Sequence, residues 1–362
     1  MRHPIKQISL PAALLAVLPF LVAPASAARK APKPGGGGES GTLVVLNKAE
    51  ASASLIDLPT GRVVATVATG VGPHEAAVSP DGRLAVAANY GAQTPGSTLT
   101  VIDVAGGRAL RTIALGEHRR PHGLAWLPDG RHLAVTSEQS RALLVVDAIA
   151  GTVAAAIDTD QKVSHMVALA RNGKRAYVAN IESGSVTVID LEARARLASI
   201  QTGAGAEGIA LSPDGTTLWV TNREADTVSV VDTAKLEVAA TLPSASFPIR
   251  AASTPDGKTV LVSNAKSGDL AIFDVATRAE RKRIKMALDP GSSEGRLFGD
   301  QMGESPVPIG IVVHPSGKTA YVANAHADVI AVVDIDAGRV TGTLKAGKEP
   351  DGMAHSTVRV NP

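Results

Sequence analysis

One pattern recurs along the whole chain: a turn of the Pro-Asp-Gly type, a few apolar residues and then Asn. The turn Pro213-Asp214-Gly215, for example, precedes residues 219–222, which read Trp-Val-Thr-Asn. Further copies of this segment end at Asn89, Asn180, Asn264 and Asn324, and a looser copy follows Pro128-Asp129-Gly130. A repeat of roughly 40 residues that fills a chain predicts a propeller or a solenoid.

Each repeat contains four short apolar segments. In the unit that begins at Pro213 they are residues 218–222, 227–232, 238–242 and 248–253, rich in Val, Ile, Leu and Thr and separated by turn residues. Such segments predict strands. Four short antiparallel strands per unit form one blade of a propeller.

Counting the innermost strands predicts seven blades. They are expected to begin near Pro73, Pro121, Ser164, Ala206, Pro248, Pro308 and Pro350. The first three strands (42–47, 54–58 and 63–67) have no innermost strand before them. The last innermost strand (351–358) has no further strands after it. Closure by the C-terminal strand removes free sheet edges. We therefore expect an all-β, seven-bladed β-propeller of four-stranded antiparallel blades over residues 42–358.

The N-terminal segment has the features of a secretory signal peptide. Over residues 1–27, Arg2 and Lys6 precede an apolar run that ends in Ala25-Ser26-Ala27, a small-residue cleavage site. A membrane anchor is the alternative, but the run is short for a bilayer and contains two Pro residues. Residues 28–41 predict a flexible linker. We expect a periplasmic or secreted protein without a membrane span after cleavage.

Charge and cysteine content narrow the partners. Without Arg2 and Lys6, the remaining Lys and Arg equal the 34 acidic residues in number. A nucleic-acid groove favours a basic excess, so no nucleic-acid partner is expected. The absence of Cys excludes disulfides, thiolate metal sites and covalent haem attachment. We expect a monomer.

The repeat resembles that of a known family. Residues 177–180 and 321–324 both read Tyr-Val-Ala-Asn, and residues 228–232 read Val-Ser-Val-Val-Asp. With the preceding turns, they resemble the YVTN-type β-propeller repeat over residues 41–358. This resemblance implies an exported seven-bladed propeller without a defined activity. Residues 88–91 and 121–123 faintly resemble the lactonase-like propellers, and the haem-carrying propeller of nitrite reductase is more distantly similar.

Strand direction predicts which face of the ring carries a binding site. The Pro-Asp-Gly turns join innermost to second strands, so they lie on one face. The innermost strands begin on the opposite face, together with the most variable loops, 91–97, 116–120 and 285–307. Variable loops on a rigid scaffold usually carry binding sites.

The second residue of each innermost strand provides the candidate site. From the closing strand onward, these residues are Asp351, His74, His122, His165, Glu207, Ile249 and Ile309. They predict a polar arc opposite an apolar arc, with Glu75 and Arg250 one residue further on. His74, His122 and His165 have the ligand type of zinc, iron or another divalent metal. A hydrated rim and an organic-ligand site are the alternatives.

Further candidates lie at the ends of the second strands and in the loops. Tyr90, Glu138 and Arg223 follow second strands, while His326 lies in a loop. The recurring Asn is expected to be structural, because Asn tolerates left-handed backbone and caps turns. The long loop 286–307 is predicted to cover the apolar arc with Leu297 and Phe298 and to contact an anion through Arg296. A flexible surface loop is the alternative.

No catalytic motif identifies a reaction: Gly-x-Ser-x-Gly, His-Glu-x-x-His and phosphate-loop patterns are all missing. The sequence therefore favours an exported binding or interaction module that holds a small molecule, a metal ion or a protein partner on its loop face. Whether it is an enzyme stays open. The alternatives are a lactonase-like hydrolase that uses the His and acid rim, and a periplasmic protein that handles metal or non-covalent haem.

Overall fold

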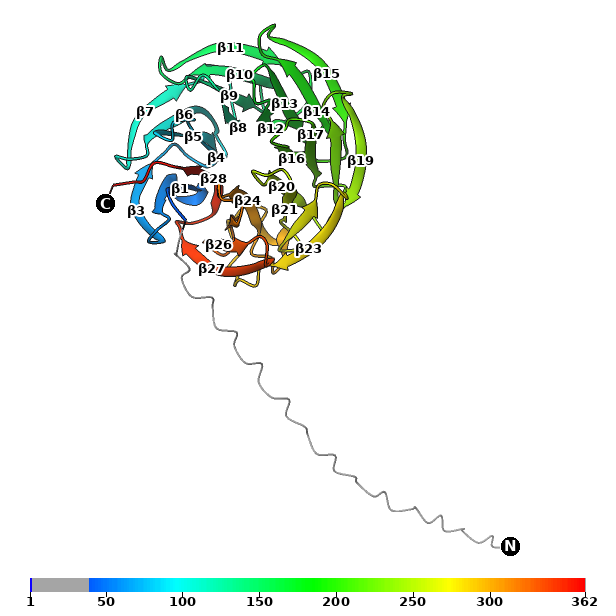
Figure 1. Cartoon of the computed structure of the whole chain (residues 1–362). Coiled ribbons are helices and arrows are strands. Elements are labelled where there is room, and N and C mark those ends of the chain that lie inside the picture. The colour runs from blue at the N-terminus through cyan, green and yellow to red at the C-terminus, as the bar shows by residue number, and fades with distance from the viewer. Residues whose placement is uncertain (2–38, 362) are drawn as a thin grey trace. The chain divides into compact units, whose positions relative to one another are not determined.

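The computed structural model describes Met1 and residues 39–361. The predicted signal peptide, apart from Met1, and the linker up to residue 38 lie outside this part of the chain. Residues 39–361 form seven four-stranded antiparallel sheets arranged in a ring (Figure 1). The prediction of a seven-bladed β-propeller is therefore confirmed.

The blades follow one another around the ring, and the strands of each blade are ordered from the innermost to the outermost. Blade 1 contains β28 (Pro350–Ser356), β1 (Thr42–Asn47), β2 (Ser52–Asp57) and β3 (Arg62–Ala68). Blade 2 contains β4 (Pro73–Val78), β5 (Leu84–Gly91), β6 (Pro95–Asp103) and β7 (Arg108–Ala114). Blade 3 contains β8 (Pro121–Trp126), β9 (His132–Ser137), β10 (Ala142–Asp147) and β11 (Thr152–Asp158).

The remaining four blades repeat this order. Blade 4 contains β12 (Ser164–Leu169), β13 (Arg175–Asn180), β14 (Ser185–Asp190) and β15 (Ala195–Gln201). Blade 5 contains β16 (Ala206–Leu211), β17 (Thr217–Asn222), β18 (Thr227–Asp232) and β19 (Glu237–Pro243). Blade 6 contains β20 (Pro248–Ser253), β21 (Thr259–Asn264), β22 (Asp269–Asp274) and β23 (Ala279–Lys285). Blade 7 contains β24 (Pro308–Val313), β25 (Thr319–Asn324), β26 (Val329–Asp334) and β27 (Arg339–Lys345). Two short 3-10 helices, η1 (Lys48–Glu50) and η2 (Gly299–Met302), lie in loops.

The two ends of this part of the chain close the ring as predicted. Strand β28 pairs antiparallel with β1, and Figure 1 shows the red C-terminal strand beside the blue N-terminal one. Residues beyond β28 add to the closure: the Arg359 guanidinium bonds the Asp57 carboxylate at 2.9 Å, and the Val360 N–H donates to Thr42 Oγ1. Blade 1 is thus assembled from both termini of the ring.

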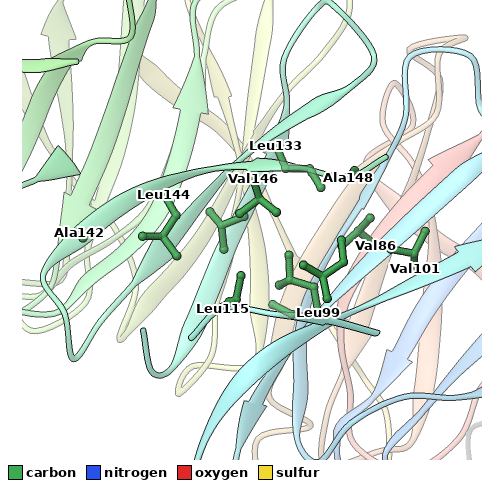
Figure 2. Close-up of a cluster of buried hydrophobic side chains, with 12 residues drawn as sticks. Val86, Leu99, Val101, Leu115, Leu133, Ala142, Leu144, Val146 and Ala148 are labelled. Atoms are coloured by element: carbon green, nitrogen blue, oxygen red, sulfur yellow. The ribbon is translucent and has the colours of Figure 1, made fainter. Parts of the chain in front are cut away.

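The core lies between neighbouring blades. The middle strands are buried on both faces because each blade packs its two faces against adjacent blades, whereas the outermost strands are largely exposed. Figure 2 shows one such cluster, in which Val86 and Leu99 of blade 2 pack with Leu133 and Val146 of blade 3. Complete burial of a Val or Leu side chain stabilises the fold by about 1.5–3 kcal/mol. The recurring apolar segments of the sequence supply this core.

The recurring turn is stabilised by the side chain of its Asp and by one glycine. In the first copy, Asp81 Oδ1 accepts hydrogen bonds from the Ser79 hydroxyl and the Arg83 N–H, at 2.6 and 3.0 Å. Gly82 has φ +76°, where a side chain would strain the backbone, and its N–H donates to the Ser79 carbonyl. We call the side of the ring that carries these turns the turn face, and the opposite side the loop face.

The recurring Asn is structural, but the backbone expectation was wrong. Asn89 is buried inside β5 and is not in the left-handed region. Its side-chain oxygen accepts from the Gly70 N–H, and its amide donates to Thr98 and Thr100. The side chain therefore ties the inter-blade loop to the second and third strands. Asn in this role needs burial, not backbone freedom.

Within residues 39–361, no helix combines the length and the apolar character that a bilayer crossing requires.

Candidate functional site

A β-bulge in every blade turns side chains toward the ring centre. In blade 2, Pro73 pairs with Asn89 and Ala76 with Ala87, so His74 and Glu75 lie in the irregular stretch between them. The other blades have the same irregularity at the same place. Bulges of this kind re-aim side chains and are common near functional sites.

As a result, the second residues of all seven innermost strands line one central cavity of about 660 Å³. This is the register that the sequence predicted, with Ile249 and Ile309 forming the apolar arc and the remaining five the polar arc. Tyr90, Glu138, Arg223 and Arg250 also line the cavity. His326 does not line it: its Nε2 lies 2.8 Å from the Leu297 carbonyl. The structure thus brings together every predicted site residue except His326.

A second recurring feature shapes the cavity mouth. The residue before each innermost strand has a positive φ, and five of these seven residues are not glycine. They are Arg120, Val163, Phe247, Val307 and Glu349, whose φ values lie between 53° and 63°. A left-handed residue other than glycine costs about 1–2 kcal/mol. Each carbonyl accepts the backbone N–H of the residue after the recurring Asn position, as in Arg120 O with Glu138 N. This bond holds Tyr90, Glu138 and Arg223 at the mouth.

Three histidines form a packed row in the polar arc. The ring centroids of His74 and His122 are 5.0 Å apart, and those of His122 and His165 are 3.6 Å apart. Carboxylates fix the two outer rings: His74 Nδ1 lies 2.8 Å from Asp351 Oδ2, and His165 Nδ1 lies 2.6 Å from Glu138 Oε1. The central ring has no such anchor, and His122 Nδ1 has no hydrogen-bond partner among the described residues.

The three rings differ in protonation. Burial lowers the pKa of His122 far below its usual value, and the positive charges of its His neighbours lower it further. Burial also lowers the pKa of His74, although Asp351 opposes the shift. For His165, burial acts in the same direction, but Glu138 and Glu207 outweigh it and raise the pKa. At neutral pH, His122 is therefore a neutral ring whose lone pair is available.

An ion-pair network crosses the channel beside the histidines. The Arg250 guanidinium of blade 6 bonds Glu75 of blade 2 at 2.6 Å and Glu207 of blade 5 at 3.1 Å. Arg223 adds a second bond to Glu207, at 2.6 Å. Burial opposes ionisation of Glu207, but Arg223, His165 and Arg250 lower its pKa below the usual range. The charge of Glu207 is therefore compensated by the protein itself, whereas burial raises the pKa of Glu75 although Arg250 opposes the shift.

The long loop covers the apolar arc as predicted. Leu297 and Phe298 pack in one apolar cluster with Ile249 and Ile309, and the Leu297 N–H donates to Glu349 Oε1 at 2.7 Å. Arg296 contacts an anion of the protein itself. Its guanidinium binds both oxygens of Asp328, at 2.7 and 2.8 Å, and so serves to anchor the loop.

One compact set of metal-binding groups lies in the polar arc. His122, Glu138 and His165 each offer a donor atom, and these three atoms lie within 4.8 Å of one another. Both histidines are buried, and the Glu138 side chain is 9 % exposed. His74, which the sequence placed among the ligands, lies outside this compact set. Tyr90 orients Glu138 by donating its hydroxyl to Oε2 at 2.6 Å.

Two cations of the cavity were not recognised from the sequence. Lys48 directly follows the Asn that ends β1, the position that Tyr90 and Glu138 occupy in their own blades. Arg120 occupies the left-handed position before β8. Aligning these two positions across the seven repeats would have revealed both residues.

The fold and site together define a seven-bladed β-propeller with a histidine-lined central cavity. The Cytochrome D1 heme domain family matches residues 129–252, less than half of the chain but including Glu138, His165 and Glu207. No curated protein matches the chain.

Two solved structures show where the fold occurs elsewhere. Hydrazine synthase from Kuenenia stuttgartiensis is similar with 23% identity and a TM-score of 0.62, over 73% of this chain and 77% of that one. A functionally unknown protein from Desulfotomaculum acetoxidans has 14% identity and a TM-score of 0.71, over 88% and 100%. Identities this low show the fold alone.

Proposed function

We propose that this protein is an exported β-propeller that binds one divalent transition-metal ion in its central cavity, through His122, His165 and Glu138. The observation that carries the proposal is the compact set itself: three buried donor atoms within 4.8 Å of one another. Two imidazoles and a carboxylate suit zinc, iron and related ions.

The surroundings support this assignment. His122 is held neutral by burial and its Nδ1 lacks a hydrogen bond among the described residues, as a ligand awaiting an ion requires. Tyr90 fixes Glu138 in the way that outer partners orient metal ligands. An ion would take the place of the proton between His165 and Glu138, so binding releases a proton.

Localisation and partners remain proposals as well. The predicted signal peptide supports a periplasmic or secreted protein. The loop face, with its covered cavity, supports a small-molecule or protein partner there, with no nucleic acid involved. The lactonase-like hydrolase stays a prediction from the sequence.

Haem is a second candidate, because the Cytochrome D1 heme domain family matches part of the ring. His122 would hold its iron, and Ile249, Ile309 and Phe298 would provide apolar contacts to the macrocycle. Binding would have to be non-covalent, since the chain has no Cys. A bound haem would supply a redox centre.

The test starts from mature protein purified from the periplasm. Elemental analysis is expected to find one transition-metal ion per chain, and the absorption spectrum separates a bare ion from haem. After chelation, Zn²⁺ is titrated by calorimetry into wild type, His122→Ala and the control His132→Ala. His132 pairs with Asp129 on the turn face, so the His132→Ala variant also loses a histidine, but one outside the cavity.

Loss of one imidazole ligand is expected to weaken Zn²⁺ binding at least about 100-fold in His122→Ala, with no change in His132→Ala. Equal Zn²⁺ affinities in all three proteins would show that His122 is not a ligand of the ion. An intense Soret band in the purified protein would show that the cavity binds haem and not a bare metal ion.

A further inference from the structure

The cavity contains two cations that form no direct ion pair with the residues that the structure describes. Lys48 and Arg120 both line it. Arg223, Arg250 and Arg296, which line it too, all form ion pairs with carboxylates. Within residues 39–361, neither Lys48 nor Arg120 forms an ion pair.

The surrounding groups do not satisfy Lys48. Asp351 and Glu349 attract its ammonium, but neither forms an ion pair with it: Asp351 bonds His74 through Oδ2, and Glu349 accepts the Leu297 N–H. The side chain is half-buried, and burial, the largest effect, lowers its pKa. A cation in this setting lacks both full hydration and a direct partner, which is unfavourable unless a ligand supplies the charge.

Arg120 is held in place without being neutralised. Its guanidinium lies 4.6 Å from the centre of the Tyr90 ring and donates to the Ala92 carbonyl. Stacking on an aromatic ring leaves the other N–H groups of the fork available for an oxyanion. At the cavity mouth, Arg120 has a left-handed backbone conformation. Such strain is common at ligand sites.

Both cations lie on the same side of the cavity as the histidine row. Tyr90, on which Arg120 stacks, contacts His74 and His122 with ring centroids 4.4 and 5.6 Å away. The Lys48 ammonium, after burial and the neighbouring histidines, is among the charges that lower the pKa of His122. Gly72 and Gly91 also line the cavity.

We propose that Lys48 and Arg120 form an oxyanion subsite, so that the cavity takes a small organic carboxylate or a phosphate beside the metal ion. This inference rests on the proposed metal site and names the ligand class of the same cavity. The Arg120 fork and the Lys48 ammonium would pair with oxygens of the anion, and His122, His165 and Glu138 would hold the ion beside it. Apolar parts of such a ligand meet Ile249, Ile309 and Phe298.

Calorimetry on the full chain loaded with Zn²⁺ tests the subsite. Malonate and inorganic phosphate are the two probes, which separate carboxylate from phosphate ligands. The variants are Lys48→Gln and Arg120→Gln, and the matched control is Lys318→Gln, which lines a different hollow on the ring. Thermal denaturation checks that each variant is folded, and Arg120→Lys provides a milder change at the same position.

At least one probe is expected to bind the wild type, and each of the two variants weakens it about tenfold or more, since a charged hydrogen bond is lost. The control keeps the wild-type affinity. The subsite is overturned if neither probe binds, or if both variants bind as tightly as the wild type. Zn²⁺ affinity is measured separately in each variant and is expected to be unchanged, so failure of the metal site would be recognised independently.

Discussion

Acidic side chains have different roles on the two faces of the ring. On the turn face, Asp81, Asp129, Asp214 and Asp256 recur in four of the blades, stay near solvent and accept hydrogen bonds from their own turns. On the loop face, Glu207 and Asp351 occupy equivalent strand positions but are buried, and each has a different partner.

The difference shows how to separate scaffold from site in a repeat protein. A side chain that recurs at one position in most blades satisfies a need that most blades share, such as closing a turn or tying a loop. A side chain that differs between blades, such as Glu207 at a position where other blades have His, Asp or Ile, serves the molecule as a whole. The ring then concentrates these exceptions in one cavity.

The largest effect is expected on the loop face. Arg250→Ala leaves Glu75 and Glu207 buried with less compensation, and breaking a buried ion pair from one side costs about 3–5 kcal/mol. Urea denaturation measures the loss of unfolding free energy. The turn-face control Arg83→Ala removes an exposed cation and is expected to cost less than about 1 kcal/mol. Similar losses in both variants would contradict the contrast between the faces.

The recurring Asn should give an intermediate effect. Asn222→Ala removes two side-chain hydrogen bonds, to Thr227 and Ser229, and leaves buried hydroxyls without that partner. We expect a loss of about 2 kcal/mol by urea denaturation. Zn²⁺ affinity is expected to stay at the wild-type value, because the residue is scaffold. A metal defect in a stably folded Asn222→Ala protein would argue that the recurring Asn also belongs to the site.

The smallest effect is expected at a single turn. Hydrogen bonds from Ser212 first, and then from Thr216, lower the pKa of Asp214 below its ordinary value of about 3.9. A lowered carboxyl pKa stabilises the fold above the unfolded-state pKa, and that stability is lost as the pH falls through the folded-state pKa. Asp214→Ala is expected to cost about 1 kcal/mol at pH 7 and less below pH 4, measured as unfolding free energy at both values. A cost that grows on acidification would contradict this role.

Much of the scaffold follows from local sequence. The starts of the innermost strands and the inward-facing row from His74 to Asp351 were predictable, because the bulge recurs at a fixed offset from each strand start. The placing of Leu297 and Phe298 over the apolar arc followed from the loop's position and composition. The YVTN resemblance, the signal peptide and the monomeric state stay predictions.

The remaining details depend on the closed ring. Glu75 and Arg250 are distant in sequence and meet only because the ring brings opposite blades together across the channel. Arg296 was expected to contact an anion, but nothing local shows that this anion is the carboxylate of Asp328. The left-handed Arg120 and Glu349 precede Pro, a setting that disfavours such backbone, so local rules point away from it.

The function of this propeller is expected to lie where the repeat is broken, in the central cavity. A crystal structure of the Zn²⁺-loaded protein, with anomalous data at the zinc edge, tests this claim most directly. We predict one strong peak in the central cavity, bound by imidazole nitrogens of His122 and His165 and by the Glu138 carboxylate. A peak at the turn-face pair His314 and His355, whose ring centroids are 4.8 Å apart, with none in the cavity, would contradict it.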